Sequence, residues 1–262
     1  MRLVAIYNIW DDWDWLEISI KNLQGLVDGV IIVASESSNY GEISPIPEKW
    51  KGKVNIREPF FNHPLNCETD KRNYGLDLAK QQGYTHFISM DADELYERET
   101  FLKAKDRFHV EPDLVGLVCE TQVYFGSVNL TIGKDVTLVP FIHKIVPGIK
   151  HEFNRMYPYA WDNGKIRIDP SRSLSVVSGV KMDPIITHHF SWVRKDYPKK
   201  IRNSTARNNI QRSSILNDLV QPTAGKFIEF YQRSLVPATV DFNIDDKIFK
   251  TTVHEGLQPS TT

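Results

Sequence analysis

An apolar stretch that ends in closely spaced carboxylates is the part of the sequence best suited to chemistry. Phe87-Ile88-Ser89-Met90 leads directly into Asp91, Asp93 and Glu94. Divalent cations such as Mg²⁺ and Mn²⁺ prefer carboxylate oxygens and commonly bridge to substrate phosphates. The pattern therefore predicts a Mn²⁺ or Mg²⁺ site at Asp91 and Asp93, whose cation neutralises a diphosphate leaving group. The plainer alternative is a solvated acidic turn.

The elements that must position this turn alternate along the first ninety residues. Apolar runs and helical spacing predict strands at 3–7, 30–34, 54–57 and 86–90, and helices at 13–23 and 67–82. This order is typical of an α/β fold with an open, mostly parallel sheet and helices on both faces. Ligands bind such sheets at the carboxyl ends of the strands. Polar residues follow the predicted strands at Asn8, Ser35, Glu36, Glu58 and the segment 91–94.

The second half is less regular. Residues 114–125 and 136–146 are predicted as two long strands that pair. Residues 176–180 and 185–190 are predicted as short strands, and residues 196–235 as mainly helical.

Four segments in order carry a family resemblance: Val4–Asn8 with Asp12-Trp13, Val27–Val33, Lys71–Gly75 and Tyr84–Glu94. They resemble the opening strand and helix, the second strand, the helix before the metal motif, and the Asp-x-Asp segment of family 2 glycosyltransferases with the GT-A fold. The resemblance covers residues 1–95. It implies a metal-dependent, inverting transfer of a sugar from a UDP- or GDP-sugar to a hydroxyl of a glycan or another acceptor.

The resemblance also implies roles for individual residues. Ser35-Glu36-Ser37-Ser38 departs from the Asp-Asp-Gly-Ser pattern familiar in that family. The implied residues are Tyr7 and Asn8 near the base, Glu36 as the carboxylate after the second strand, Arg72 near the nucleotide, and Asp91 and Asp93 at the ribose and the metal.

An inverting transfer needs a carboxylate that deprotonates the acceptor hydroxyl. Glu152, in Ile149-Lys150-His151-Glu152-Phe153, is the leading candidate, since some of these enzymes carry a His-Glu pair at a comparable point. Asp162, beside Trp161, competes for the role, and Glu120 is a third candidate.

The segment 187–195 carries two histidines followed by two basic residues. Neighbouring residues on a strand point to opposite sides, so His188 and His189 do not easily bind one ion together. One of them, with His189 favoured, is a candidate to complete the metal site begun by Asp93; the alternative is a buried histidine bonded to backbone. Arg194 and Lys195 are candidates to reach a diphosphate.

Two tryptophans are candidate acceptor-site residues. Aromatic faces suit the apolar sides of sugar rings, although core packing is their more frequent use. On this basis Trp161 and Trp192 are predicted to lie at the acceptor.

The formal net charge of −1, from 32 basic and 33 acidic residues, excludes a general attraction to nucleic acid or to an anionic membrane. The charge is segregated, with a net −5 over residues 86–120 and a net +6 over residues 181–212. The basic segment, with Trp192 and Tyr197, would suit a modified nucleic acid as acceptor, which is not the favoured interpretation.

Cysteine content and hydropathy indicate the compartment. Cys67 and Cys119 cannot form a disulfide framework, and we expect both to be reduced thiols. The N-terminal apolar run is too short for a signal peptide, and no stretch reaches the roughly 20 apolar residues of a membrane span. We therefore expect a cytoplasmic protein without a membrane span.

The sequence as a whole favours a GT-A-type catalytic domain over residues 1–195, with a nucleotide-binding half over 1–95 and an acceptor half over 96–195. An irregular, mainly helical C-terminal extension is expected over 196–262. One alternative is a phosphohydrolase in which Asp91 is the nucleophile and Asp93 the acid-base. Another is a non-catalytic module that binds a nucleotide or a glycan.

Overall fold

A computed structural model describes residues 1–59, 63–204 and 234–245. The elements of the first ninety residues are β1 (Leu3–Ile9), α1 (Trp13–Asn22), β2 (Gly29–Ala34), a 3-10 helix (Glu48–Trp50), β3 (Asn55–Ile56), α2 (Pro64–Gln81) and β4 (His86–Met90). Those that follow are β5 (Glu94–Leu95), α3 (Arg98–Val110), β6 (Gly116–Phe125), β7 (Leu130–Lys144), β8 (Trp161–Asp162), β9 (Lys165–Ile166), β10 (Val180–Trp192), α4 (Tyr197–Asn203) and β11 (Val236–Pro237).

The sheet has the order β3-β2-β1-β4-β7-β6-β10-β5, with β11 paired to β7. The four strands of the first ninety residues are parallel to one another, with Ala5 opposite both Val30 and Ile88. β7 then pairs antiparallel with β4. The predicted α/β class with a mostly parallel first half is therefore confirmed.

The described chain divides into two compact units. One consists of residues 1–121 and 136–187, and the other begins with residues 122–135 and continues from residue 188. The first unit holds the parallel strands and helices α1 to α3. The predicted domain boundary at residue 195 stays a prediction.

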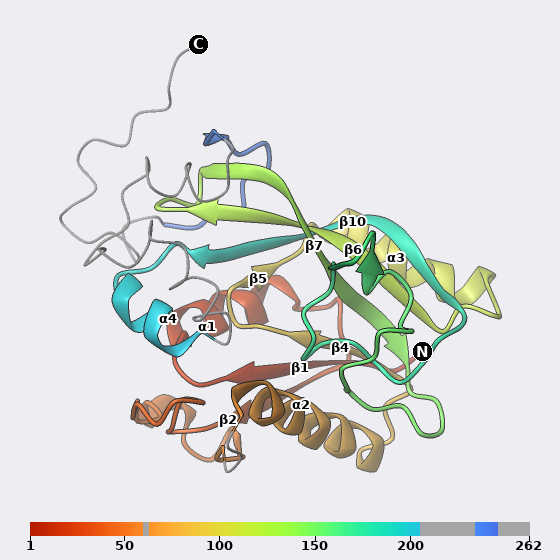
Figure 1. The fold of residues 1–262 in the computed structure, drawn as a ribbon, viewed down its shortest axis with the longest axis horizontal. Helices are drawn as coiled ribbons and strands as arrows, with labels where there is room; N and C mark the ends of the chain where they lie inside the picture. Colours follow the sequence, from red (N-terminus) through yellow and green to blue (C-terminus); the bar gives the residue numbers. More distant parts are fainter. Residues whose placement is uncertain (60–62, 205–233, 246–262) are drawn as a thin grey trace. The chain divides into compact units, whose positions relative to one another are not determined.

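Helices cover both faces of β1, because successive side chains of a strand point to opposite sides. On one face, α2 approaches so closely that a Cβ on Gly75 would lie 2.4 Å from Cγ2 of Ile6 and 3.0 Å from Cγ2 of Val33. On the other face, the next residue, Tyr7, is buried with its hydroxyl 2.8 Å from Ser19 Oγ of α1. Figure 1 shows α1 and α2 on opposite sides of β1.

The second half differs from its prediction in two places. The two short strands expected at 176–180 and 185–190 are replaced by β10, which begins only at Val180 and continues to Trp192. Helix α3 was not predicted, because charged residues interrupt its apolar spacing and leave three buried side chains: Phe101, Ala104 and Phe108. Of the helical extension expected over 196–235, α4 is described, and residues 205–233 lie outside the described part of the chain.

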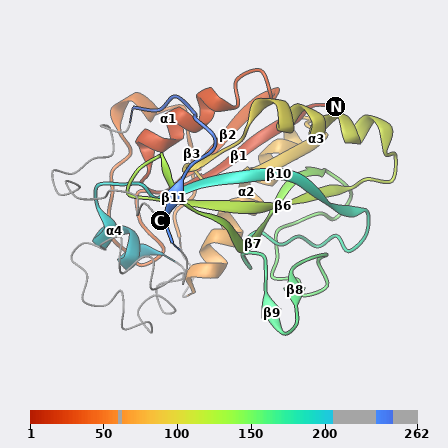
Figure 2. The same ribbon diagram turned by 90° about the horizontal axis from the view of Figure 1, so that it is seen from above.

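The first unit also contains a short hairpin, β8–β9, in which Trp161 is opposite Ile166. It projects away from α2 and the parallel strands (Figure 2). Both cysteines are buried, and neither forms a disulfide. Within the described residues, the helices are too short or too polar to cross a bilayer.

Replacing Gly75 with alanine tests the close approach of α2 to the sheet. Helix propensity alone would favour alanine by about 1 kcal/mol. Because the added methyl group meets Ile6 and Val33, we expect Gly75→Ala to lower the free energy of unfolding by about 1–3 kcal/mol instead. Urea unfolding measures the change, and Gln81→Ala at an exposed position of the same helix is the control. A stabilised Gly75→Ala protein would contradict this packing.

The buried histidine of β7 predicts how stability depends on pH. Burial lowers the pKa of His143 to about 3, and its Nε2 lies 2.7 Å from the hydroxyl of Tyr157. As the pH falls below about 6.5, His143 is protonated in the unfolded chain but stays neutral in the folded protein. Its contribution to the free energy of unfolding is therefore fully present above that pH and is lost as the pH falls from 6.5 toward 3.

We expect His143→Gln to reduce this loss by about 1.4 kcal/mol per pH unit between pH 6 and 4. Urea unfolding at several pH values measures the slope, and His109→Gln, at an exposed position of α3, is the control. An unchanged slope in His143→Gln would show that this histidine is already charged in the folded protein.

Candidate functional site

The candidate site lies where β1, β2 and β4 end at one edge of the parallel sheet. Since these strands are parallel and in register, the residues that follow them meet at that edge. They are Asn8 and Ile9 at the end of β1, Ser35 and Glu36 after β2, and the turn Asp91–Glu94 after β4. The predicted clustering of polar residues at the strand ends is therefore what the fold produces.

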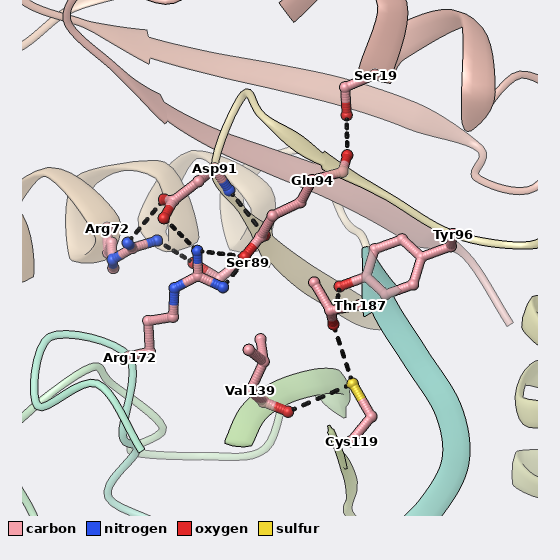
Figure 3. A network of polar contacts seen from close by, with 10 residues as sticks. All are labelled: Ser19, Arg72, Ser89, Asp91, Glu94, Tyr96, Cys119, Val139, Arg172 and Thr187. Atoms are coloured by element: carbon pink, nitrogen blue, oxygen red, sulfur yellow. Dashed lines mark hydrogen bonds and ion pairs between the residues drawn. The ribbon is translucent and has the colours of Figure 1, made fainter. Parts of the chain in front are cut away.

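Two buried arginines hold the turn after β4 (Figure 3). Arg72 of α2 donates from Nη1 to Ser89 Oγ at 2.9 Å and from Nη2 to Asp91 Oδ1 at 2.9 Å. Arg172 donates from Nη2 to Asp91 Oδ2 and to Glu94 Oε1, the latter at 2.8 Å, and from Nη1 to Glu94 Oε2 at 3.2 Å. Both oxygens of Asp91 therefore accept from a guanidinium group.

These arginines are almost fully out of solvent, with 2% of Arg72 and 3% of Arg172 exposed. A buried charge is tolerated only where opposite charges and hydrogen bonds compensate it. Burial alone would lower the pKa of Arg172, but the carboxylates of Asp91 and Glu94 raise it well above its usual value. The arginine therefore stays charged.

The same turn is tied to α1 and to neighbouring strands of the first unit. Glu94 Oε2 accepts from the backbone N–H of Asp91 at 3.0 Å, and the Glu94 carbonyl accepts from Ser19 Oγ at 2.7 Å. Asn22 bonds both backbone groups of Tyr96, at 2.9 and 3.0 Å. The hydroxyl of Tyr96 accepts from Thr187 Oγ1 of β10 at 3.1 Å (Figure 3). The turn is thus fixed from several elements.

Within the part of the chain that the structure describes, one group of residues has the donor set of a metal site. Asp91 and Asp93, both in the first unit, each offer a carboxylate oxygen, and these atoms lie within 4.8 Å of each other. Asp93 is buried, and Asp91 is half-buried. Carboxylate oxygens are ligands that bind divalent cations. The group can therefore bind a metal.

The loop after β2 is held by its backbone. The carboxylate of Glu58 accepts from the N–H groups of Glu36 and Ser37, at 2.8 and 3.1 Å. The buried Nζ of Lys71 donates to the Ile9 carbonyl at 2.8 Å and to Ser35 Oγ at 3.0 Å. Burial lowers the pKa of Lys71 to about 8. Glu36 is left with an exposed side chain at the edge of the sheet.

Tyr7 and Asn8, which are expected near the base of the nucleotide, differ in their burial. Tyr7 is fully buried, and its hydroxyl bonds Ser19 of α1. Asn8 is half-buried, and its Oδ1 has no hydrogen-bond partner among the described residues. Their proposed contacts with a nucleotide stay predictions.

The two candidate bases lie on different parts of the first unit. Glu152 pairs with Lys150 at 2.9 Å, and its backbone bonds Ser173 in both directions, at 3.0 and 2.6 Å. Asp162 lies on the β8–β9 hairpin and pairs with Arg167 at 3.0 Å. Trp161 beside it is 41% exposed, with the Arg155 guanidinium 4.9 Å from its ring centroid.

The remaining predicted residues belong to the second unit. His188 is buried, with Nδ1 2.8 Å from the Tyr124 hydroxyl. Trp192 is buried and stacks on Tyr197, whose hydroxyl donates to the Trp192 carbonyl at 2.9 Å. Arg194 is buried and donates to the Ser191 carbonyl at 2.6 Å, whereas Lys195 is exposed.

Sequence reasoning missed three charged residues that surround the turn or the loop. Glu68 precedes Arg72 by one helical turn, and burial, with the nearby charge of Asp169, raises its pKa to about 7. Its helical spacing to Arg72 was a usable signal. No local signal marks Lys71 or Arg172 as buried, because basic residues in a polar stretch are normally exposed to solvent.

The comparisons with known proteins find only distant structural similarity. No protein-family profile and no curated protein matches it. Among solved structures, S. aureus TarS is 16% identical with a TM-score of 0.33, over 55% of this chain, and the chain spans 28% of that protein. Residues 1–349 of TarS are 14% identical with a TM-score of 0.39, over 88% of this chain and 73% of theirs.

The same TarS fragment has been solved in complex with UDP and with UDP-GlcNAc. A putative glucose-1-phosphate thymidylyltransferase from Bacillus anthracis is 9% identical with a TM-score of 0.29, over 48% of this chain and 59% of its own. At these values the similarity assigns neither a substrate nor a reaction to this chain.

Proposed function

We propose that the protein is a glycosyltransferase that moves a sugar from a nucleoside diphosphate sugar, of the UDP or GDP class, to an acceptor hydroxyl with inversion. The observation that carries the proposal is the pair of carboxylates Asp91 and Asp93 in the turn after β4, where ligands of parallel sheets bind. A hydrolase, a transferase or a binding protein can share the fold, so the argument rests on this group rather than on the fold.

The ligand set supports a divalent cation, Mn²⁺ or Mg²⁺, at this group. When bound, such a cation supplies positive charge opposite a departing diphosphate. The chain supplies the rest: Asp93 and His189 hold the cation, and Arg194 and Lys195 are the proposed basic contacts of the diphosphate. Asn8 Oδ1, which has no hydrogen-bond partner among the described residues, and the exposed Glu36 are the proposed contacts of the nucleoside.

Glu152 is the proposed base that takes the proton of the acceptor hydroxyl. The backbone pairing of Glu152 with Ser173 supports this choice, because Ser173 adjoins Arg172, which binds Asp91. Asp162 has no such link and is on a hairpin, where with Trp161 it is the proposed contact of the acceptor.

The hydrolase alternative has less support. A nucleophilic carboxylate needs a free oxygen to attack phosphorus. Both oxygens of Asp91 accept from buried guanidinium groups, which stabilise the carboxylate and weaken it as a nucleophile.

Replacing Asp93 with asparagine tests the cation site. The substitution keeps the shape of the side chain and removes one charged ligand. We expect metal-dependent transfer to fall at least about 100-fold, because a bound cation contributes several kcal/mol to the transition state. Sugar release from a panel of UDP- and GDP-sugars with Mn²⁺ measures the change.

The matched control for Asp93→Asn is Asp106→Asn, at an exposed position of α3. Circular dichroism checks that both variants fold. Transfer near the wild-type rate by folded Asp93→Asn would sink the proposed cation site. Binding of a nucleoside diphosphate without turnover on any acceptor would instead favour a non-catalytic module.

Replacing Glu152 with glutamine tests the base. General base catalysis contributes about 100- to 10,000-fold, so we expect transfer to fall within that range while Mn²⁺ binding is retained. Asp162→Asn is the paired variant, and we expect it to change the KM of the acceptor more than kcat. The reverse pattern, with Asp162→Asn inactive and Glu152→Gln active, would assign the base to the hairpin.

A further inference from the structure

Arg172 is a charged residue at the turn to which the proposed reaction assigns no role. It comes from a segment 78 residues beyond Glu94, yet its guanidinium bonds two of the three carboxylates of the turn, those of Asp91 and Glu94. The carboxylate between them, that of Asp93, is the buried member of the metal group. Arg172 therefore binds the turn on both sides of Asp93, a proposed metal ligand.

The segment that carries Arg172 is itself fastened. The N–H of Arg172 donates to the Asp169 carbonyl at 2.9 Å, and Ser173 Oγ donates to the Glu152 carbonyl at 2.6 Å. Leu174 forms a β-bridge with His151, whose N–H donates to Asn73 Oδ1 of α2 at 2.7 Å. The guanidinium is therefore anchored to α2, and its position does not depend on a free loop.

The charges of the turn explain why these ion pairs matter. Asp91, Asp93 and Glu94 put three carboxylates within four residues, and they repel one another in a medium of low dielectric. Arg72 and Arg172 supply two compensating charges that are present before any cation arrives. A turn held in this way is pre-organised, so little free energy is lost in ordering its carboxylates when a cation binds.

We infer that Arg172 is a positioning residue for the cation site: by holding Asp91 and Glu94 it fixes the turn that presents the Asp93 carboxylate. The inference rests on the proposed function, in that the cation binds at Asp93. For the affinity of the cation, a positioning role predicts the opposite change from charge alone. Removing a positive charge beside a cation site should tighten cation binding by charge alone, whereas loss of the positioned turn should weaken it.

The test uses variants that separate charge from position. Arg172→Met alone removes the buried guanidinium that Asp91 and Glu94 share, which can prevent folding. Arg172→Met combined with Glu94→Gln removes one charge of each sign, so the net charge of the turn is unchanged. Arg172→Lys keeps the charge but loses the two-pronged geometry. Arg107→Met is the matched control, because Arg107 of α3 also bridges two carboxylates, those of Glu111 just after α3 and Asp183 of β10.

Calorimetry with Mn²⁺, alone and with UDP or GDP, measures cation affinity. We expect the double variant and Arg172→Lys to bind Mn²⁺ at least about 10-fold more weakly than the wild type, and Arg107→Met to bind it as the wild type does. In transfer assays the KM for Mn²⁺ should rise while kcat at saturating Mn²⁺ stays close to the wild-type value. Hydrogen exchange of the metal-free protein should speed up over residues 91–97 in the double variant and not in Arg107→Met.

Each outcome has a separate meaning. Equal or tighter Mn²⁺ binding by the folded double variant or by Arg172→Lys would overturn the positioning role and leave the proposed function intact. A wild-type protein that binds no Mn²⁺ under any of these conditions would overturn the cation site, and this inference with it.

Discussion

The compensation of buried charge at the end of β4 is the constraint on which the candidate site depends. Three carboxylates follow a strand whose residues are all buried, and two of them are matched by guanidinium groups that solvent scarcely reaches. Neither set of charges could be buried without the other. The turn, the helix that carries Arg72 and the segment that carries Arg172 are therefore held in place by one network.

The rest of the first unit keeps the members of this network at bonding distance. Arg72 lies on the buried face of α2, and Gly75 on the same helix lets α2 approach Ile6 and Val33. On the opposite face of the sheet, Ser19 and Asn22 of α1 bond the backbone just after the turn. The close contact of α2 with the sheet and the polar contacts of α1 thus fix the turn from both sides.

The sequence predicted the parts of the structure that local pattern determines. Continuous β-branched and apolar runs predict β1, β2 and β4, and because parallel strands end at the same edge of a sheet, they also predict the place of the turn Asp91–Glu94. The choice of His189 over His188 as a further metal ligand stays a prediction, because the opposite orientation of neighbouring strand residues indicates only that the two do not easily bind one ion together. What the sequence could not supply was Arg172, because its partners are about eighty residues away and nothing local distinguishes it from a solvated arginine. Tyr7 shows the converse case, since a position at the end of a strand did not reveal that its ring turns toward α1.

The pairing of Glu152 with Ser173 has a consequence for how the protein can vary. These two residues close the stretch between them into a loop whose ends are fastened to each other, and the β8–β9 hairpin lies within it. Chain added to or removed from the hairpin tip changes neither end of the loop, so Arg172 keeps its place. The length and sequence of this hairpin can therefore change, and with them the surface that it presents, without displacing the charged turn after β4.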